Sequence, residues 1–361
     1  MTERANEQPS RVAPAHPVAM HHPDRTSAWV IALIARAGGD RPFLVPSEIE
    51  RNLSKLLRIS PMLASRLHGD QWIAAEAPSI QWVDQETDPI ALLPLHHFDL
   101  GSEAPIRLVG ASDGTWLALC AHHFAFDGLA MVAVLRGLVT GSPEEIALVR
   151  PSGGVSPPEL PWPVLRRALS PVDAVAFSAH PNPSEVLLAR RLEVAGKDIT
   201  ARLSAACALA VVEHNRRLGI PMRKLGISVA VGGIGKQSAT YRRIDVLRGQ
   251  PISHIVKEAL ESKGIPRELV ALPRAASLLR PFLGRLSDTI LVSNLGRHEL
   301  GAVAQLDFFP VARGRSAVAF GLASIPGQQS TLSIRTLFLS RPDAQMILDR
   351  TIEEFDHELS A

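Results

Sequence analysis

The sequence predicts an α/β protein built from two lobes. Segments with the apolar spacing of helices alternate with short apolar segments typical of strands, which is the pattern of α/β and α+β folds. The chain has 361 residues, enough for two hydrophobic cores. Prolines are frequent between residues 141 and 185, and we expect this stretch to connect an N-terminal lobe (27–140) to a C-terminal lobe (186–361). Residues 1–26 combine prolines with little apolar periodicity, so we expect a disordered tail.

Composition excludes several classes of function. Apolar residues make up 46% of the chain, charged residues 20%, and the formal net charge is +2. The basic residues are scattered among 36 acidic ones, so no basic stripe indicates nucleic acid binding. No apolar stretch is long enough to span a bilayer, and the N-terminus lacks the apolar segment of a signal peptide. Cys120 and Cys207 lie in apolar runs and are expected to be reduced core residues. We therefore expect a cytoplasmic protein with neither a membrane nor a nucleic acid as partner.

The N-terminal lobe is expected to begin with a helix and to contain a hairpin. Ser47 and Glu50 form the pattern of a capping box, and the helix they begin ends at Pro61. Residues 105–109 and 115–121 flank a turn that contains Gly114, which predicts a β-hairpin. A helix is expected at 129–139. Further elements are expected as a short helix at 164–169, helices at 198–217, 252–262 and 340–359, and strands at 225–231, 289–293, 317–323 and 331–339.

The segment His122-His123-Phe124-Ala125-Phe126-Asp127-Gly128 carries the candidate chemistry. Neighbouring side chains on a strand point to opposite faces, so only one of the two histidines can face a given cavity. A neutral imidazole can take a proton from an attacking amine or hydroxyl near pH 7. Asp127 lies on the following turn, where it can pair with an arginine, and Gly128 permits close packing. Because adjacent strand residues diverge, the segment does not predict a metal site.

This segment resembles the His-His-x-x-x-Asp-Gly signature of nonribosomal-peptide condensation domains and the related chloramphenicol-acetyltransferase-like acyltransferases. Other segments are also similar to parts of that family. They are Ser60–Leu67, compared with "His-Pro-x-Leu-Arg-x-Arg-Phe"; Phe98–Leu100 with Pro105 and Arg107, compared with "Phe-Asp-Leu … Pro-Leu-Arg"; and Val292–Arg297, compared with "Ser/Thr-Asn-x-Gly". The "Asp-Phe-Gly-Trp-Gly" of the family's plant branch is absent, and Asp307–Phe309 is only a faint echo of it.

The resemblance implies a two-lobed chloramphenicol-acetyltransferase-like (condensation-domain) fold with a tunnel between the lobes. It implies that His123 is the catalytic base, supported by His122 and Gly128, and that Asp127 has a structural role in an ion pair with Arg66. Ser293 and Asn294 either face the tunnel and hold the oxygen of the intermediate, or only complete a strand. Ala130 stands where the family has a serine, and Ala64 where it has the first arginine of its segment, which puts the usual donor contacts in doubt.

The implied function is transfer of an acyl group from a thioester to a hydroxyl or amine, forming an ester or amide in natural-product biosynthesis. The thioester, on coenzyme A or on the phosphopantetheine of a carrier protein, is a co-substrate, and we expect no bound cofactor or metal. A chain without its own adenylation or carrier domain would meet an acyl or peptidyl carrier protein in trans, together with a small-molecule acceptor. The alternative is the same fold repurposed as a cyclase or as a non-catalytic binding scaffold.

Overall fold

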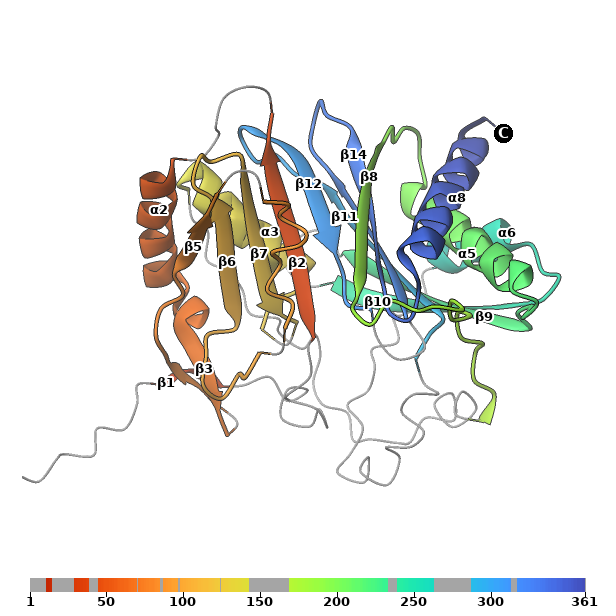
Figure 1. The fold of residues 1–361 in the computed structure, drawn as a ribbon, viewed down its shortest axis with the longest axis horizontal. Helices are drawn as coiled ribbons and strands as arrows, with labels where there is room; N and C mark the ends of the chain where they lie inside the picture. The colour runs from red at the N-terminus through yellow and green to blue at the C-terminus, as the bar shows by residue number, and fades with distance from the viewer. Residues whose placement is uncertain are drawn as a thin grey trace, which may run out of the picture.

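The computed structural model of the chain describes residues 11–14, 29–38, 45–69, 71–84, 87–96, 98–123, 125–142, 169–232, 239–262, 287–312 and 317–360. These residues form two large mixed sheets that stand next to each other, each with its own helices, and one small sheet at the periphery (Figure 1). Each large sheet has its own cluster of buried apolar residues, so the molecule has the two cores that its length predicts.

The N-terminal lobe is a five-stranded sheet in the order β12-β2-β7-β6-β5. Its central strands are almost wholly apolar and buried, as expected where a sheet is covered on both faces. Helices α2 (Pro46–Ile59) and α3 (Gly128–Thr140) pack against each other in this lobe. The strands are β2 (Val30–Ala37), β5 (Ile80–Val83), β6 (Ile106–Ala111), β7 (Trp116–His122) and β12 (Val303–Phe309).

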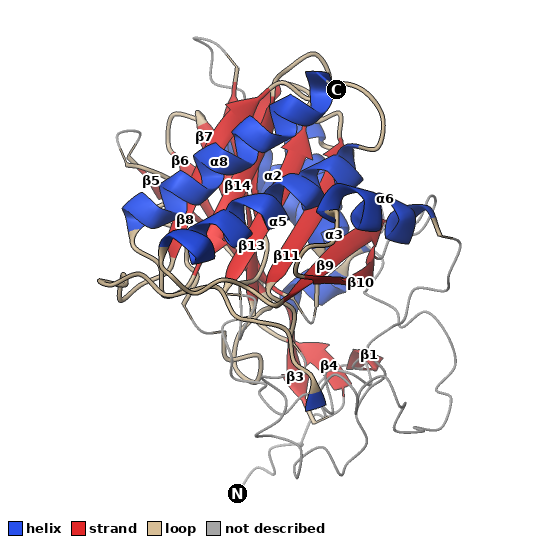
Figure 2. Ribbon diagram, turned by 90° about the vertical axis from the view of Figure 1, so that its right-hand side faces the viewer, coloured by secondary structure: helices blue, strands red, loops and turns tan. Residues whose placement is uncertain are grey.

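A three-stranded sheet in the order β1-β4-β3 lies apart from the large sheets (Figure 2). It contains β1 (Arg11–Pro14), β3 (Ser65–His68) and β4 (Gln71–Ala74), and the 3-10 helix η1 (Pro61–Ala64) precedes β3. The expectation of a wholly disordered N-terminal tail is therefore wrong for residues 11–14, because their backbone pairs with β4.

The C-terminal lobe is a six-stranded sheet in the order β10-β9-β11-β13-β14-β8. Three helices, α5 (Ile199–Arg217), α6 (Ile252–Glu261) and α8 (Arg341–Ser360), cover one of its faces (Figure 2). Small buried residues along α5, including Ala206 and Ala210, leave room for α8 beside it. The strands are β8 (Val186–Leu192), β9 (Lys224–Gly232), β10 (Ala239–Leu247), β11 (Ile290–Arg297), β13 (Val318–Ser324) and β14 (Ser330–Thr336).

Strand β12 joins the two lobes. It belongs to the C-terminal half of the chain, yet it pairs antiparallel with β2 at the edge of the N-terminal sheet, and Figure 1 shows it between β2 and the strands of the other sheet. Arg36 of β2 donates to the buried carboxylate of Asp307 at 3.1 Å, which reinforces this pairing. The expected division into two consecutive lobes therefore needs one correction, since residues 303–309 complete the N-terminal sheet.

At Gly321 of β13 the two large sheets lie very close together. A Cβ atom on Gly321 would lie 2.1 Å from the carbonyl oxygen of Phe308 and 2.7 Å from the hydroxyl of Ser333. The Ser333 hydroxyl itself donates to that Phe308 carbonyl. A side chain at position 321 would thus occupy the space that the β12 backbone fills, so a glycine is needed here for room rather than for backbone conformation.

Most of the elements expected from the sequence are present. The hairpin is formed by β6 and β7 with Gly114 at a positive φ of 76°, and α3 ends at Gly141, which has a φ of 67°. The capping box is wrong: Val45 is the N-cap of α2, and Glu50 instead accepts a hydrogen bond from the Trp82 indole at 2.9 Å. The short helix expected at 164–169 lies almost entirely outside the described residues. Among the residues that the structure describes, no helix is long and apolar enough to cross a membrane.

We predict that Gly321→Ala destabilises the protein by about 1–3 kcal/mol, the usual cost of an added methyl group in a packed region, because the β12 backbone must move away from β13. Chemical denaturation of the two proteins measures the difference. Ser333→Ala is the control, since it removes one hydrogen bond worth about 1 kcal/mol without adding bulk. A Gly321→Ala variant as stable as the wild type would mean that the two sheets can separate there at no cost.

Candidate active site

His123 lies on the turn between β7 and α3. Its amide donates to the carbonyl of Trp29 at 2.7 Å, which continues the pairing of β7 with β2 for one more residue. The carbonyl of His122 accepts from the amides of Ala125 (3.0 Å) and Phe126 (3.2 Å), and these bonds close the turn. The half-buried imidazole of His123 is therefore held by a backbone that is fixed on both sides.

The ring of His123 is held by the backbone of its own turn. Nδ1 lies 3.0 Å from the carbonyl oxygen of Phe126. A carbonyl oxygen can only accept a hydrogen bond, so in a neutral ring this contact places the proton on Nδ1 and the lone pair on Nε2. The same arrangement orients histidines that act as bases, because a second group fixes the tautomer.

His122 points into the protein instead. It is fully buried, and its ring meets that of Phe98 edge to face at a centroid distance of 6.2 Å. This agrees with the expectation that only one of the two histidines faces a cavity. Phe98 is in turn covered by the guanidinium of Arg107, which lies 3.7 Å from the ring centroid.

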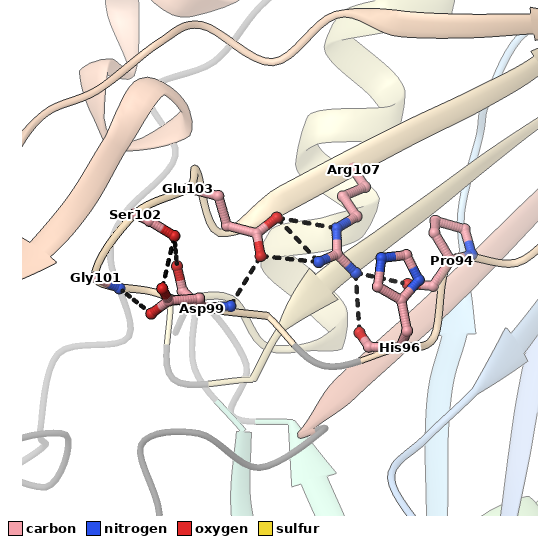
Figure 3. Close-up of polar contacts among 7 residues, drawn as sticks. All are labelled: Pro94, His96, Asp99, Gly101, Ser102, Glu103 and Arg107. Atoms are coloured by element: carbon pink, nitrogen blue, oxygen red, sulfur yellow. Dashed lines mark hydrogen bonds and ion pairs between the residues drawn. The ribbon is translucent and has the colours of Figure 1, made fainter.

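A polar network holds the loop that carries Phe98, and Figure 3 shows its members turned toward one another. Arg107 donates to both carboxylate oxygens of Glu103 at 2.9 Å and to the carbonyls of Pro94 (3.1 Å) and His96 (2.9 Å). The Asp99 side chain accepts from the amide of Gly101 at 3.0 Å. The segment Phe98–Arg107 that resembles the family therefore supports the strand end from behind rather than facing the cavity.

Asp127 and Gly128 organise the start of α3. Asp127 is the N-cap, and its buried carboxylate accepts from the amide of Ala130 at 2.8 Å. A Cβ atom on Gly128 would lie 2.6 Å from Leu295 and 3.1 Å from Phe308, so the missing side chain lets the C-terminal half of the chain pack against the helix. This agrees with the predicted role of Gly128 in close packing.

The predicted ion pair between Arg66 and Asp127 is not formed. Both residues are described, and Arg66 uses its Nη1 to donate to the carbonyl of Gly101 at 2.9 Å. Arg66 belongs to β3 in the small sheet, whereas Asp127 caps a helix of the N-terminal lobe. The similarity of the segment around Arg66 therefore does not carry over to a role at the site.

A cavity of about 60 Å³ lies next to His123, between the two lobes. Its described lining combines a few polar groups with mostly apolar side chains. The N-terminal half contributes Ile31, His123, Asp127, Gly128 and Leu129; the C-terminal half contributes Ala230, Leu291, Ser293, Asn294, Leu295, Phe308, Pro310 and Val311. The site is thus shared by both halves of the chain. The tunnel that the resemblance implies remains a prediction.

Ser293 and Asn294 both reach this cavity but differ in what their side chains do. The Asn294 amide donates to the hydroxyl of Thr200 at 3.0 Å, and its oxygen accepts from the amide of Gly296 at 2.8 Å. Within the described residues the hydroxyl of Ser293 has no hydrogen-bond partner, although the residue is only 9% exposed. Asn294 thus shapes the end of β11, and Ser293 retains a donor for a molecule in the cavity.

The start of α3 supplies further donors. The first amides of a helix have no carbonyl partner within it, and two residues that carry such amides, Gly128 and Leu129, line the cavity. These amides and the helix dipole favour negative charge at this point, part of which the Asp127 carboxylate already supplies as the N-cap. The site can therefore take up a proton at His123 and stabilise a developing oxyanion nearby.

The cysteines are not candidates for the nucleophile. Burial raises the pKa of the Cys120 thiol to about 12, although Arg335 and Arg107 act in the opposite direction. Burial also raises the pKa of Cys207 well above its usual range. Both thiols are protonated near neutral pH, and both are fully buried.

Sequence analysis missed several parts of the site. The carbonyl of Phe126 that orients His123 is a backbone group, so no residue type in the sequence indicates its role. Leu291 and Leu295 lie on either side of Ser293 and Asn294, and only these two polar residues were predicted to belong to the site. Phe308 lies in the segment Asp307–Phe309, which is only weakly similar to the family motif. The two adjacent phenylalanines were the one sequence feature that could have indicated a buried wall here.

Neither a protein-family model nor a curated protein sequence matches the chain. Solved structures do match its fold over nearly the whole length. The first condensation domain of the calcium-dependent antibiotic synthetase, in complex with a substrate analogue, is 14% identical, with 95% of each chain covered and a TM-score of 0.59. The epimerization domain from the third module of tyrocidine synthetase B is 12% identical, with 99% of each chain covered and a TM-score of 0.56.

A third solved structure is the complex of the X-domain and OxyB from teicoplanin biosynthesis. It is 17% identical, with 98% of this chain and 94% of that chain covered, and its TM-score is 0.51. Three proteins with different descriptions thus share this architecture. The similarity therefore shows the fold, and the chemistry has to be argued from the residues of the site. The chain has the two-lobed condensation-domain fold.

Proposed function

We propose that the chain is a condensation-type acyltransferase. It transfers an acyl group from a thioester, on a carrier protein or on coenzyme A, to the hydroxyl or amine of a small molecule in natural-product assembly. The observation that carries this proposal is the His123 imidazole, whose Nδ1 is tied to the Phe126 carbonyl while the ring lines a cavity between the lobes.

His123 acts as the general base in this proposal. Nε2 accepts the proton of the attacking hydroxyl or amine as the new bond to the thioester carbonyl forms. The imidazolium is stabilised through Nδ1–H by the Phe126 carbonyl. When the tetrahedral intermediate collapses, the bond to sulfur breaks and the proton returns from Nε2 to the thiolate that leaves.

The oxygen of the tetrahedral intermediate carries the negative charge that the site must stabilise. The hydroxyl of Ser293 and the first amides of α3 are the donors proposed for it, because they reach the same cavity from opposite lobes. Asn294 holds the end of β11 through Thr200 and Gly296 and is proposed to position Ser293.

The fold supports natural-product assembly as the setting, since condensation domains of synthetases have the same architecture. We propose an acyl or peptidyl carrier protein acting in trans as the partner that delivers the thioester. The thioester is a substrate in this account, and no bound cofactor or metal takes part in the proposed steps.

A binding scaffold is the second candidate function, and the size of the cavity favours it. About 60 Å³ is far below the roughly 300–1,000 Å³ of typical ligand pockets, so only the reacting groups fit there without movement of the lobes. The similar X-domain is found in complex with a protein, OxyB. A scaffold would bind a partner in this way and would turn over no thioester.

We predict that His123→Ala lowers the kcat for acyl transfer by about 10²–10⁴-fold, the usual contribution of a general base. Acyl-coenzyme A and acyl-carrier thioesters should be mixed with candidate amines and alcohols, and product and free thiol followed by mass spectrometry. Equal product from wild type and His123→Ala would contradict the role of His123.

The matched control for this experiment is His298→Ala. His298 is also a half-buried histidine bonded to a nearby backbone carbonyl, that of Leu295 at 2.8 Å, but it is not among the described residues that line the cavity. Its variant should keep near wild-type turnover. If the wild type turns over no thioester with any acceptor, acyl transfer is wrong and the scaffold function is favoured.

We predict that Ser293→Ala lowers kcat by about 10²-fold with little change in KM, because the hydroxyl bonds the oxyanion more strongly than the ground-state carbonyl. Ser324→Ala is the control, since Ser324 is equally buried but pairs with the hydroxyl of Ser330 at 2.7 Å. A Ser293→Ala variant that turns over as fast as Ser324→Ala would rule out this donor.

A further inference from the structure

Arg335 is a fully buried charged side chain in the middle of the molecule. It lies in β14, a strand whose seven residues are all buried, and among the described residues it is the largest side chain with no exposed surface. Burial of an arginine costs free energy unless its donors find partners. Its partners therefore indicate what the residue does.

The guanidinium contacts three elements. Nε and Nη2 donate to one oxygen of Glu185, just before β8, at 3.0 and 2.6 Å. Nη1 donates to the carbonyl of Val30 in β2 at 2.5 Å and lies 3.5 Å from the carbonyl of Pro310, directly after β12. One side chain of the C-terminal sheet thus reaches the backbone of β2 and of the residue that follows β12, its neighbour in the N-terminal sheet.

An apolar residue at position 335 could pack in the sheet with similar stability. Buried ion pairs are often no more stabilising than apolar residues of similar volume, so stability alone does not explain an arginine here. What an arginine adds is a rigid fork of donors that can bind a carboxylate on one side and backbone carbonyls on another. Because these hydrogen bonds have fixed lengths and directions, they set the distance between the two sheets in addition to holding them together.

The carbonyls that Arg335 binds belong to the frame of the candidate site. Val30 lies opposite His122 in the β2–β7 ladder, and the carbonyl of the preceding Trp29 accepts the amide of His123. Pro310 lines the cavity, as does Ile31 next to Val30. Movement of the Val30 and Pro310 carbonyls would therefore displace both His123 and the wall that it faces.

We propose that Arg335 is a positioning residue: by joining Glu185 to the carbonyls of Val30 and Pro310, it sets where His123 of one lobe stands relative to the cavity wall of the other. This role in catalysis rests on the proposed function of His123. The positioning itself is a property of the structure and can be measured without a substrate.

The test compares Arg335→Met, Arg335→Lys and Glu185→Gln with wild type. The readouts are hydrogen exchange of the His123 amide and the NMR resonances of the His123 ring. Arg335→Met should speed exchange of that amide at least tenfold and shift the ring resonances. Arg335→Lys, with one ammonium in place of a fork, should give an intermediate result.

Arg243→Met is the matched control, because it breaks another ion pair to a buried carboxylate, that of Asp288 at 3.2 Å, within the C-terminal lobe. It should lower stability while leaving the exchange of the His123 amide and its ring resonances unchanged. Wild-type exchange and resonances in Arg335→Met would overturn the proposal. If Arg335→Met does not fold, wild-type exchange and resonances of His123 in both Arg335→Lys and Glu185→Gln would overturn the proposal.

Activity separates this inference from the proposed function. With a thioester that the wild type turns over, Arg335→Met should lower kcat at least tenfold and leave the donor KM within about twofold, since the thioester still binds while the base is misplaced. An unchanged kcat would contradict positioning. If the wild type turns over no thioester, the proposed function fails, and the exchange and ring measurements still decide whether Arg335 positions His123.

Discussion

The structure depends on the close approach of β12 to the C-terminal sheet over Gly321. At this point the carbonyl of Phe308 occupies the space that any side chain at position 321 would need. The same residue directs its ring toward Gly128 and the cavity. Because β12 also completes the N-terminal sheet, the backbone contact that joins the lobes is also the contact that builds one wall of the site.

The candidate site follows from this junction. One lobe presents His123 on a closed turn, and the other brings Ser293 to the far side of the cavity. Neither half of the chain has the site by itself. The relative position of the two sheets therefore sets the distance between His123 and Ser293, the proposed base and oxyanion donor. In this proposal an interaction between the sheets, such as that of Arg335 with the Val30 carbonyl, acts on the chemistry without contacting a substrate.

Local signals in the sequence predicted much of the fold. Gly114 and Gly141 stand at positive φ, so the hairpin and the end of α3 could be placed from turn chemistry alone. The residues of β2 are almost all apolar, and periodicity cannot separate such a fully buried strand from a buried helix segment. Strand β12 was missed because its partner lies in the other half of the chain, and pairing over that separation leaves no local pattern.

The site was predictable where the chemistry belongs to side chains in one segment. His123, Asp127 and Gly128 come from one segment and line one cavity, whereas the pairing of Arg66 with Asp127 required two distant segments to meet, and they do not. The predicted capping box is wrong because α2 begins at Pro46, so Ser47 lies inside the helix, and Glu50 bonds to the distant Trp82 instead. Arg335 does stand out in the sequence, as the one charged residue within an otherwise uncharged strand.

We propose that His123 acts as a base whose ring proton lies on Nδ1, where the Phe126 carbonyl accepts it. Nitrogen-15 NMR of the histidine side chains, with His123 assigned by comparison with His123→Ala, measures which ring nitrogen carries the proton. We expect a protonated Nδ1 and an unprotonated Nε2 at a pH where the ring is neutral. A proton on Nε2 under those conditions would contradict it, because the ring would then offer the cavity a donor in place of a base.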